Sequence, residues 1–503
     1  MPAVDPVSLW RRTAPDPVGD DRQPDRVDIV VAGAGLAGLA TALELCRQGR
    51  QVVVLDAGAL GGRTTSRTTG KVSLLQGTTL NGIRRHAGDE VLRAYLDANA
   101  AGQRWLHREL IDVPGAWEPR SAYTYATTGA GDAALRAEAE AMQAAGRPPA
   151  VLGRGAIGLP FAVRSALLLT EQAQLHPVLA ADVLIQRIRH LGGAVVSDAR
   201  VRGVDVSERR VQVTTSRGIV EAAHLILTTG MPVLDRGLFF ARLTPRRQVV
   251  GAYRLPGDEL PPEGMYLSAD PEVRSLRGAQ DEDGRPLLIV GGGDHVTGRA
   301  DVGARLRSVD AWVRRQHPEA ERVAWWAAQD YTMNSRVPAV GRLPGGRARV
   351  HVATGFAKWG MTNAAAAALT LAGDLSGATP DWAVRLRRRR TGARDIGETV
   401  AANGRVAGRL VAGWVAPGRT TTASSRGRVV RRGIRPVAES RIDGRTCRVS
   451  AVCTHLGGVV RWNDAESSWD CPLHGSRFTA DGAVIEGPAV KDLPTLDHEE
   501  TKT

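Results

Sequence analysis

The sequence predicts two folded units, a large α/β domain with an interleaved antiparallel sheet and a small all-β domain after it. Three observations support this expectation. A strand-like apolar run, a glycine-rich turn and a helical pattern follow one another between residues 26 and 56. A proline- and arginine-rich stretch over residues 232–328 contains the strand-like run LLIVGGG. From about residue 428, short strands alternate with turn signals such as Asp443-Gly444.

The composition is that of a globular chain with more than one domain. Its 503 residues exceed what one hydrophobic core ordinarily holds. Hydrophobic residues make up 43% and charged residues 24%, as in soluble proteins. The net charge of +13 is spread along the chain instead of forming one basic stripe, so we expect no nucleic-acid partner.

Membrane insertion and export are not expected. The longest uncharged windows, Ile29–Leu43 and Trp359–Gly373, are shorter than the roughly 18–20 residues that cross a bilayer. Arg11-Arg12 is followed by a polar stretch where an export signal would be apolar. Three of the four cysteines lie close together in sequence (Cys447, Cys453 and Cys471), which favours a metal site in a reducing, cytoplasmic setting over a disulfide framework. Cys447 is expected to be a buried core residue.

The pattern divides the chain into consecutive units. They are an irregular lead-in (1–25), an α/β domain (26–385) with a second subdomain mainly within 85–170 and 232–330, a helix and linker (386–427) and a small β domain (428–503). Helical spacing of apolar residues predicts helices over 89–110, 178–193 and 396–414. A strand, a glycine turn and a helix are expected once more over 348–373.

The first strand, turn and helix form a Rossmann-type dinucleotide motif. Gly33, Gly35 and Gly38 give the pattern GxGxxG between strand and helix, and Asp56 closes the next strand. The first glycine permits the tight turn, the second admits a pyrophosphate, and the third lets the helix pack closely on the strand. The pyrophosphate would lie at the helix N-terminus, where free N–H groups favour anions. Asp56 would accept hydrogen bonds from ribose hydroxyls.

Two loops near the C-terminus offer metal ligands. The first contains Cys453 and His455, and the second contains Cys471 and His474. Two cysteines and two histidines suit either structural zinc or a Rieske [2Fe–2S] cluster. A zinc finger of this composition places its cysteines together and its histidines together, whereas here each loop gives one of each. Because one Rieske iron takes both sulfurs and the other takes both imidazoles, this spacing favours the cluster.

Both halves resemble known families. The stretches GGRTTSRTTGKV (61–72), LILTTG (225–230) and VHVATGFAKWGMT (350–362) resemble motifs of FAD enzymes of the glycine and D-amino-acid oxidase (DAO) family. CTHLG and CPLHGS resemble the two Rieske loops. The resemblance covers residues 7–492 and implies FAD and a Rieske cluster as cofactors. It further implies FAD contacts from ten residues: Arg63, Thr64, Thr65, Ser66, Thr229, Gly230, Gly355, Gly360, Met361 and Thr362.

The resemblance implies an FAD-dependent oxidoreductase that behaves as a dehydrogenase. Its substrate would be an amine or an amino-acid-like molecule, oxidised by hydride transfer to FAD. Electrons would then pass singly through the cluster to an external acceptor, either a protein or a quinone-like molecule. The alternative is a redox-sensing or electron-carrier protein without a small-molecule substrate. A reductase fed by NAD(P)H is disfavoured because no second GxGxxG occurs in a βαβ setting.

Two lysines are candidate catalytic residues. Of 66 basic residues only four are lysines, and two of these, Lys71 and Lys358, lie inside the flavin-like motifs. An amine there could stabilise reduced flavin or, with a lowered pKa, transfer a proton. Candidates for the substrate face are Tyr123, Tyr125, Tyr331 and Arg336, whereas His176 and His295 are expected to be structural.

The C-terminal domain departs at three positions from the pattern of high-potential Rieske domains. Gly458 and Leu473 stand where many members carry two further cysteines that form a disulfide. Phe478 stands where high-potential members carry tyrosine, while Ser476 remains as a hydroxyl donor to the cluster. Fewer hydrogen bonds to sulfur stabilise the reduced cluster less, so we expect a potential below that of the respiratory type.

Overall fold

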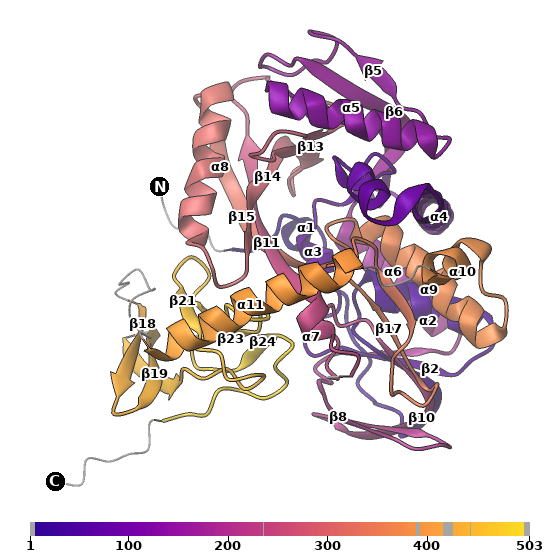
Figure 1. Cartoon of the computed structure of the whole chain (residues 1–503), viewed down its shortest axis with the longest axis vertical. Helices are drawn as coiled ribbons and strands as arrows, with labels where there is room; N and C mark the ends of the chain where they lie inside the picture. Colours follow the sequence, from indigo (N-terminus) through magenta and orange to yellow (C-terminus); the bar gives the residue numbers. More distant parts are fainter. Residues whose placement is uncertain (1–5, 235, 389–392, 416–425, 443, 497–503) are drawn as a thin grey trace.

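The computed structural model describes residues 6–234, 236–388, 393–415, 426–442 and 444–496 (Figure 1). The large domain contains an eight-stranded and a nine-stranded sheet, and the C-terminal domain contains two small antiparallel sheets. This arrangement confirms the predicted fold class. Within the described ranges, no helix is both long and apolar enough to cross a bilayer.

The eight-stranded sheet contains the predicted βαβ unit. Strand β1 pairs in parallel with β2 on one side and with β10 on the other. The strand order is β16-β17-β10-β1-β2-β7, and the hairpin β8-β9 extends from β10. The strands are β1 (Arg26–Ala32), β2 (Val52–Leu55), β7 (Ala194–Val196), β8 (Val201–Val206), β9 (Val211–Thr215), β10 (Gly218–Leu227), β16 (Ala339–Arg342) and β17 (Val350–Thr354).

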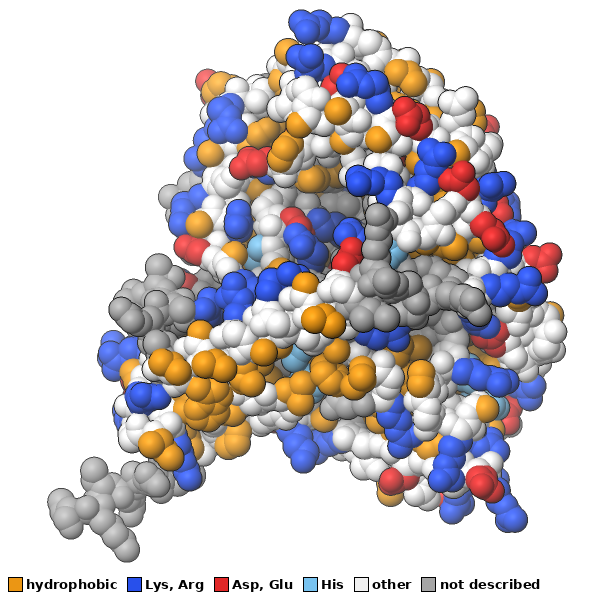
Figure 2. Space-filling view, viewed as in Figure 1, with side chains coloured by type: hydrophobic (Ala, Val, Ile, Leu, Met, Phe, Trp, Pro, Cys, Tyr) orange, Lys and Arg blue, Asp and Glu red, His pale blue; other side chains and the backbone are white. Residues whose placement is uncertain are grey.

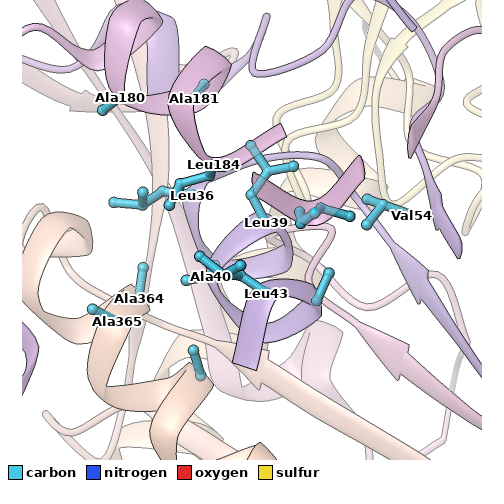
Figure 3. Close-up of a cluster of buried hydrophobic side chains, with 14 of the residues drawn as sticks. Leu36, Leu39, Ala40, Leu43, Val54, Ala180, Ala181, Leu184, Ala364 and Ala365 are labelled. Atoms are coloured by element: carbon cyan, nitrogen blue, oxygen red, sulfur yellow. The ribbon is translucent and has the colours of Figure 1, made fainter. Parts of the chain in front are cut away.

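Helix α2 (Leu36–Arg47) forms the centre of the first core. It packs between α6 (Pro177–His190) and α9 (Gly360–Ser376), as Figure 3 shows. Leu39 and Leu43 of α2 are fully buried in this cluster. The run Ala364–Ala368 of α9 presents only methyl groups to the cluster, which lets the two helices approach closely. The packing fixes the N-terminus of α2 at the carboxyl edge of the sheet.

The nine-stranded sheet covers one side of this unit. Its order is β15-β11-β14-β13-β12-β4-β6-β3, with β5 paired to β6. The strands are β3 (Lys71–Val72), β4 (Trp117–Ala126), β5 (Ala150–Leu152), β6 (Ser165–Leu175), β11 (Leu243–Arg254), β12 (Met265–Ser268), β13 (Ser275–Gln280), β14 (Pro286–Val296) and β15 (Glu321–Met333). The predicted run LLIVGGG lies in β14.

Four further helices of the large domain position parts of the two sheets. They are α3 (Thr64–Arg67), α4 (Thr79–Leu110), α5 (Gly129–Ala144) and α8 (Val302–Gln316). α4 contains the predicted helix over 89–110 but begins ten residues earlier, because Gly88 joins two helical pieces with φ 86° and ψ 174°. Only a residue without Cβ adopts that conformation readily, so α4 bends at Gly88.

The lead-in is more ordered than predicted. Trp10 lies in the short helix α1 (Trp10–Thr13) and is 2% exposed. Its indole N–H donates to Thr68 O over 2.7 Å, and the guanidinium of Arg277 lies 4.9 Å from its ring centroid. The expectation of an irregular segment over 1–25 was wrong at this point, because a buried tryptophan ties the segment to the large domain.

The C-terminal domain follows two helices. α10 (Asp381–Arg388) and α11 (Ala393–Val415) come first, and the predicted linker falls largely on residues 416–425, outside the described ranges. The strands are β18 (Gly427–Arg432), β19 (Arg435–Ile442), β20 (Arg445–Ser450), β21 (Arg461–Asn463), β22 (Ser468–Asp470), β23 (Arg477–Thr479) and β24 (Val484–Glu486). α11 lies across the domain and packs Val406 and Leu410 against its core (Figure 1).

Cys447 is half-buried, not buried as predicted. It lies on the same face of β20 as the buried Val449, but nearer the exposed start of the strand. The core covers Val449 and only part of Cys447.

Candidate functional site

A cavity of about 440 Å³ lies where three parts of the chain meet. The glycine turn after β1 and the segment Gly61–Thr65 line one part. Strands of the nine-stranded sheet line a second part, including Gln248 and Ser275. The third part comes from the C-terminal domain, through Ile485–Gly487 and Ala489–Val490. The cavity is therefore shared by both domains.

The glycine turn leaves room for a ligand at the start of α2. Gly33 has φ +105°, and a Cβ on Gly38 would lie 1.9 Å from Gly33 O, so both positions exclude side chains. Asp56 accepts hydrogen bonds from the N–H groups of Ala34 (2.7 Å) and Gly58 (3.1 Å). Burial raises the pKa of Asp56, and these two hydrogen bonds oppose the rise. Asp56 thus holds the turn and lines the cavity.

Most of the other predicted FAD contacts also line the cavity. Those that do are Arg63, Thr64, Thr65, Thr229, Gly230, Gly355, Gly360 and Met361, together with Gly33 and Gly35. Gly38 does not, because it packs α2 against the turn. The glycines among these residues leave the backbone open at a helix N-terminus, which fits the pyrophosphate and ribose of FAD.

Two predicted contacts lie elsewhere. Ser66 is buried, and its hydroxyl donates to Arg63 O over 3.4 Å. Thr362 is 1% exposed and donates to Asn99 Oδ1 of α4 over 2.5 Å. Neither lines the cavity, so their placement does not support the predicted contact. In both cases the helix turns the side chain toward the protein core.

Lys71 reaches the cavity from β3. Its ammonium group donates to Tyr266 O (2.6 Å) and Ser275 Oγ (2.8 Å). None of the ion pairs in the described part of the chain includes Lys71. Burial lowers the pKa of Lys71 well below its ordinary value, and the nearby charge of Arg277 lowers it further. A cavity-lining lysine without a carboxylate partner is able to lose its proton.

Lys358 also lines the cavity. It has φ +74°, and its ammonium group lies 2.9 Å from Asp294 Oδ1. Its backbone N–H donates to Asp330, a carboxylate whose pKa burial raises. Asp330 also lines the cavity. It was missed from the sequence because one aspartate in a β-strand pattern carries no signal of its own.

Of the four residues proposed for the substrate face, one lines the cavity and three do not. Tyr331 lines the cavity, and burial raises its pKa well above the ordinary value. Tyr123 stacks on Tyr266 with ring centroids 4.7 Å apart, and Tyr125 is buried in the core of the nine-stranded sheet. Arg336 lies 3.7 Å from Glu398 and does not line the cavity.

The two histidines expected to be structural have structural partners. His176 caps α6, since its Nδ1 accepts from Leu179 N, and its Nε2 lies 2.9 Å from Thr13 Oγ1. His295 Nδ1 lies 2.8 Å from Gly293 O.

The two Cys/His loops share one backbone pattern. Cys453 N–H donates to Gly458 O, and Gly457 N–H donates back to Cys453 O (2.8 and 3.0 Å). Cys471 N–H donates to Ser476 O, and Gly475 N–H donates back to Cys471 O (2.8 and 3.2 Å). Both returning glycines have positive φ. The loops are thus matched and bring equivalent side chains to the same place.

The matched loops bring like ligands together. The Cys453 and Cys471 thiols are hydrogen-bonded, and the imidazole centroids of His455 and His474 lie 5.2 Å apart. No three Cys, His, Asp or Glu side chains of the described residues converge as one metal ion would require. A pair of sulfurs beside a pair of imidazoles fits a cluster with two irons better than single tetrahedral zinc.

Donors surround the Cys453 sulfur. The hydrogen bond with Cys471 contributes most to lowering the pKa of Cys453, to about 7, and the N–H groups of His455 and Leu456 and the hydroxyl of Ser476 add to it. Ser476 is fully buried, and its oxygen accepts from Ala489 N over 3.0 Å, which leaves its proton for sulfur. The backbone N–H groups and the Ser476 hydroxyl, which remain available when both cysteines ligate iron, would stabilise negative charge on sulfur.

The missing disulfide is replaced by apolar packing. A Cβ on Gly458 would lie 2.6 Å from Leu473 Cδ1, so the leucine side chain rests directly on the first loop. Phe478 is fully buried in the domain core. The loops are therefore held together by packing.

Replacing Ser476 by alanine is expected to lower the midpoint potential of the cluster by tens of millivolts. The variant removes one hydroxyl donor and leaves the backbone donors in place, so the reduced cluster is stabilised less. The companion variant Phe478→Tyr adds a hydroxyl and is expected to raise the potential. Redox titration followed by electron paramagnetic resonance (EPR) measures both, and equal potentials in all three proteins would contradict the role of Ser476.

The cluster loops contact the large domain closely. The ring of Phe240, from α7 (Phe239–Arg242), lies edge-on to His455 and His474, with centroids 5.8 and 5.5 Å away. A Cβ on Gly475 would lie 2.5 Å from Pro245 Cβ. The Gln329 amide donates to Gly475 O over 2.9 Å. The histidine side of the loops thus faces the large domain.

A buried ionic network joins the two domains. Arg247 of β11 is 1% exposed and lies 2.7 Å from Glu466 of the C-terminal domain. Glu466 also lies 3.1 Å from Arg477 and 3.8 Å from Arg67, and Arg477 lies 2.9 Å from Asp470. Sequence reasoning missed this network, because Arg247 and Glu466 are 219 residues apart in the chain.

Comparisons with known proteins agree with both sites. The FAD dependent oxidoreductase (DAO) family model matches residues 28–373, and the Rieske [2Fe-2S] domain model matches residues 418–497. The chain is 30% identical to a Bacillus subtilis (strain 168) protein named as Rieske 2Fe-2S iron-sulfur protein YhfW, over 98% of each chain. A shorter stretch of 54 residues is 54% identical to cytochrome b6-f complex iron-sulfur subunit 1 of Nostoc sp., covering 11% of this chain and 30% of that one.

Solved structures share the fold of the large domain. L-proline dehydrogenase from P. horikoshii has a TM-score of 0.59 at 16% identity, covering 73% of this chain and 98% of its own. L-amino acid deaminase from Proteus vulgaris has a TM-score of 0.57 at 15% identity, covering 72% and 97%. At such identities the likeness shows the fold alone. The family models and the full-length relative decide the identity: the chain belongs to the DAO family of FAD-dependent oxidoreductases and carries FAD together with a C-terminal Rieske [2Fe–2S] centre.

Proposed function

We propose that this oxidoreductase is a dehydrogenase for an amine or an amino-acid-like substrate and releases its electrons singly to an external acceptor. The observation that carries the proposal is the shared cavity, which the dinucleotide turn, the nine-stranded sheet and residues 485–490 of the C-terminal domain line together. We also propose a cytoplasmic location, supported by four cysteines that are all free of disulfides.

The residues around the cavity divide the work. Bound FAD would accept the two electrons that leave the substrate when its C–N bond is oxidised. The Rieske centre would carry electrons one at a time. Ten residues would hold FAD: Gly33, Gly35, Asp56, Arg63, Thr64, Thr65, Thr229, Gly230, Gly360 and Met361. Gly355 would bring the following helix end close. Cys453, His455, Cys471 and His474 would ligate the cluster.

Lys71 would handle the substrate proton. An amine substrate arrives largely as an ammonium ion, and its C–N bond can be oxidised only after that proton leaves. Lys71 Nζ, buried at the cavity wall with a lowered pKa, can accept it. Lys358, which is paired with Asp294 and lines the cavity, would position the ligand by charge.

Gln329 offers a route between the cavity and the cluster loops. Its side chain is 2% exposed, and its Oε1 accepts from Thr297 Oγ1 over 2.7 Å. Its Nε2 donates to the hydroxyl of Tyr331, which lines the cavity, and to Gly475 O, beside the ligand His474 (2.8 and 2.9 Å). Since every polar atom of this amide is used, its orientation is fixed. Tyr331 and Gln329 would form a hydrogen-bonded connection between the two cofactor sites.

Replacing Gln329 by leucine is expected to slow reduction of the cluster several-fold without slowing reduction of the flavin. Leucine keeps the volume but removes both donor hydrogen bonds. Stopped-flow absorbance and rapid-freeze EPR separate the two phases. The control is Thr297→Val, which removes the bond to Oε1 but leaves both donors of the amide. Equal cluster rates in wild type and Gln329→Leu would contradict the route.

Anaerobic titration of the purified protein with a panel of amines and amino acids tests the function. A substrate is expected to bleach the flavin first and then produce the EPR signal of a reduced Rieske centre. Flavin bleaching by NADH alone, or no bleaching with any member of a broad panel, would contradict the proposal.

A further inference from the structure

An apolar patch surrounds the first cluster loop where it reaches the surface. Four exposed side chains form it: Val411 (62%), Trp414 (38%), Val415 (70%) and Leu456 (43%). Leu456 directly follows His455, and the Trp414 indole N–H donates to Gly457 O over 3.0 Å. Figure 2 shows hydrophobic side chains gathered along the lower edge of α11 and over the adjoining C-terminal domain. A monomeric surface rarely groups such side chains without a partner.

An arginine cluster flanks the second cluster loop. Its members are Arg405 and Arg409 on α11, Arg461 on β21 and Arg299 after β14. Arg299 Nε donates to Pro472 O over 2.8 Å, so the arginine cluster is hydrogen-bonded to the second cluster loop. Across the ranges that the structure describes, none of the four forms an ion pair with a carboxylate. Burial lowers the pKa of Arg299 to about 10, and the charges of the other three lower it further.

The patch and the arginine cluster lie on two sides of the same helix. Val406 and Leu410 turn toward the C-terminal core, which leaves Arg405 and Arg409 on one flank and Val411 and Val415 on the other. Figure 2 shows basic side chains along the upper edge of α11 and apolar ones along its lower edge. His474 is buried, whereas His455 remains half-exposed. The half-exposed ligand His455 directly precedes Leu456 of the patch.

We propose that the patch and the arginine cluster together dock a small acidic one-electron carrier protein. This inference rests on the proposed function, which requires an external acceptor. Electron-transfer complexes have small interfaces, in which an apolar centre makes contact and charges at the rim steer the encounter. Each oxidised carrier takes one electron from the reduced protein, so two carriers are reduced for each two-electron substrate oxidised.

Two c-type cytochromes of opposite net charge provide the test. The holoprotein is reduced with dithionite, freed of reductant by gel filtration and mixed with either oxidised cytochrome in a stopped-flow instrument. At low ionic strength the acidic cytochrome is expected to react about tenfold or more faster than the basic one. The advantage is expected to shrink as salt screens the charges. Sedimentation of the mixture measures binding directly. Equal rates and equal binding for both cytochromes would overturn the proposal.

Variants locate the surface. Arg405→Glu with Arg409→Glu is expected to remove the preference for the acidic cytochrome, and Val411→Gln is expected to slow its reduction at all salt concentrations. The matched control is Arg104→Glu with Arg209→Glu, an equal charge change at exposed positions on α4 and between β8 and β9. The reduced-cluster EPR signal should be the same in all proteins. If the control pair had the same effect as the α11 pair, net charge alone would explain the preference and the docking site would be wrong.

A membrane surface is the alternative occupant of a basic, apolar helix. Membrane binding is measured by incubating the holoprotein with vesicles that contain or lack anionic lipid and then sedimenting the vesicles. The protein-docking proposal would be overturned by two results together. The holoprotein would bind vesicles but the Arg405→Glu, Arg409→Glu variant would not, and the acidic and basic cytochromes would be reduced at equal rates. Because chemical reduction bypasses the substrate, this outcome leaves the proposed amine oxidation standing.

Discussion

Replacing Glu466 by glutamine is expected to lower the free energy of unfolding of the docked C-terminal domain by about 3–5 kcal/mol. Glu466 is buried among Arg247, Arg477 and Arg67 at the boundary between the domains. Glutamine has the same shape but no charge, so the buried guanidinium groups of Arg247 and Arg477 lose their shared counter-ion. Burial makes that loss costly, because water cannot replace the carboxylate.

Urea titration of the holoprotein, followed by the visible absorbance of the cluster, measures this effect. Glu439→Gln is the matched control, since Glu439 also contacts three arginines (Arg428, Arg432 and Arg448). Arg428 and Arg432 are mostly exposed and Arg448 is half-exposed, so these arginines can be hydrated again and the control is expected to cost about 0–1 kcal/mol. A loss in Glu466→Gln no larger than in the control would show that the network does not hold the domains together.

The effect of Glu466 has a defined pH dependence. Burial raises the pKa of Glu466, but the charges of Arg247, Arg477 and Arg67 outweigh burial and lower it to about 2. The pKa of a glutamate in the unfolded chain is about 4.3, so the folded state binds the proton more weakly. The stabilisation that Glu466 contributes is therefore fully present above about pH 4.3. It is lost as pH falls from about 4.3 toward 2. The stability difference between wild type and Glu466→Gln should therefore narrow over this window.

The two cofactor sites could be predicted because each is encoded locally. Gly33, Gly35 and Gly38 lie within six residues, and the backbone of one turn determines what each must do. Cys453 with His455, and Cys471 with His474, likewise lie within single loops whose backbone patterns match. The strand, helix and strand around the first motif follow from apolar periodicity alone.

The surface between the domains could not be predicted, because its contacts depend on tertiary packing. Arg247 and Glu466 read as ordinary charged residues of a strand and a turn, and nothing in their neighbours marks them as buried. Gln329 is similarly unremarkable in sequence, although its amide connects the cavity to Gly475. Such residues become important because segments distant in the sequence bury them. The periodicity of apolar residues describes only one helix or strand at a time.

The two predicted FAD contacts that do not line the cavity share one physical cause. Ser66 and Thr362 lie in motifs that line the cavity, but the turn of each helix points their side chains into the core. A motif determines which stretch of backbone approaches the ligand. The position of a residue around the helix axis determines whether its side chain faces the ligand. Lys71 shows the opposite case, since its strand places its side chain on the cavity wall.

Replacing Lys71 by methionine is expected to lower kcat/KM for an amine substrate by about 10²–10⁴-fold at neutral pH, without loss of flavin. Methionine fills the same buried space but cannot accept a proton. Lys71→Arg is not expected to restore activity, because a guanidinium stays protonated at any working pH. Lys358→Met serves as the control, since Lys358 is half-exposed and paired with Asp294, and its loss should be smaller.

The pH profile distinguishes a proton acceptor from a structural lysine at position 71. Burial and Arg277 lower the pKa of Lys71, which raises the share of the neutral amine that can accept a proton. In Lys71→Met only substrate that is already deprotonated can react, so activity should rise with pH until the substrate amine itself loses its proton. The deficit relative to wild type should therefore shrink in alkaline solution. A deficit that stays constant across the pH range, or that accompanies loss of flavin, would assign Lys71 to holding Tyr266 and Ser275 in place, because neither result depends on a proton moving to Nζ.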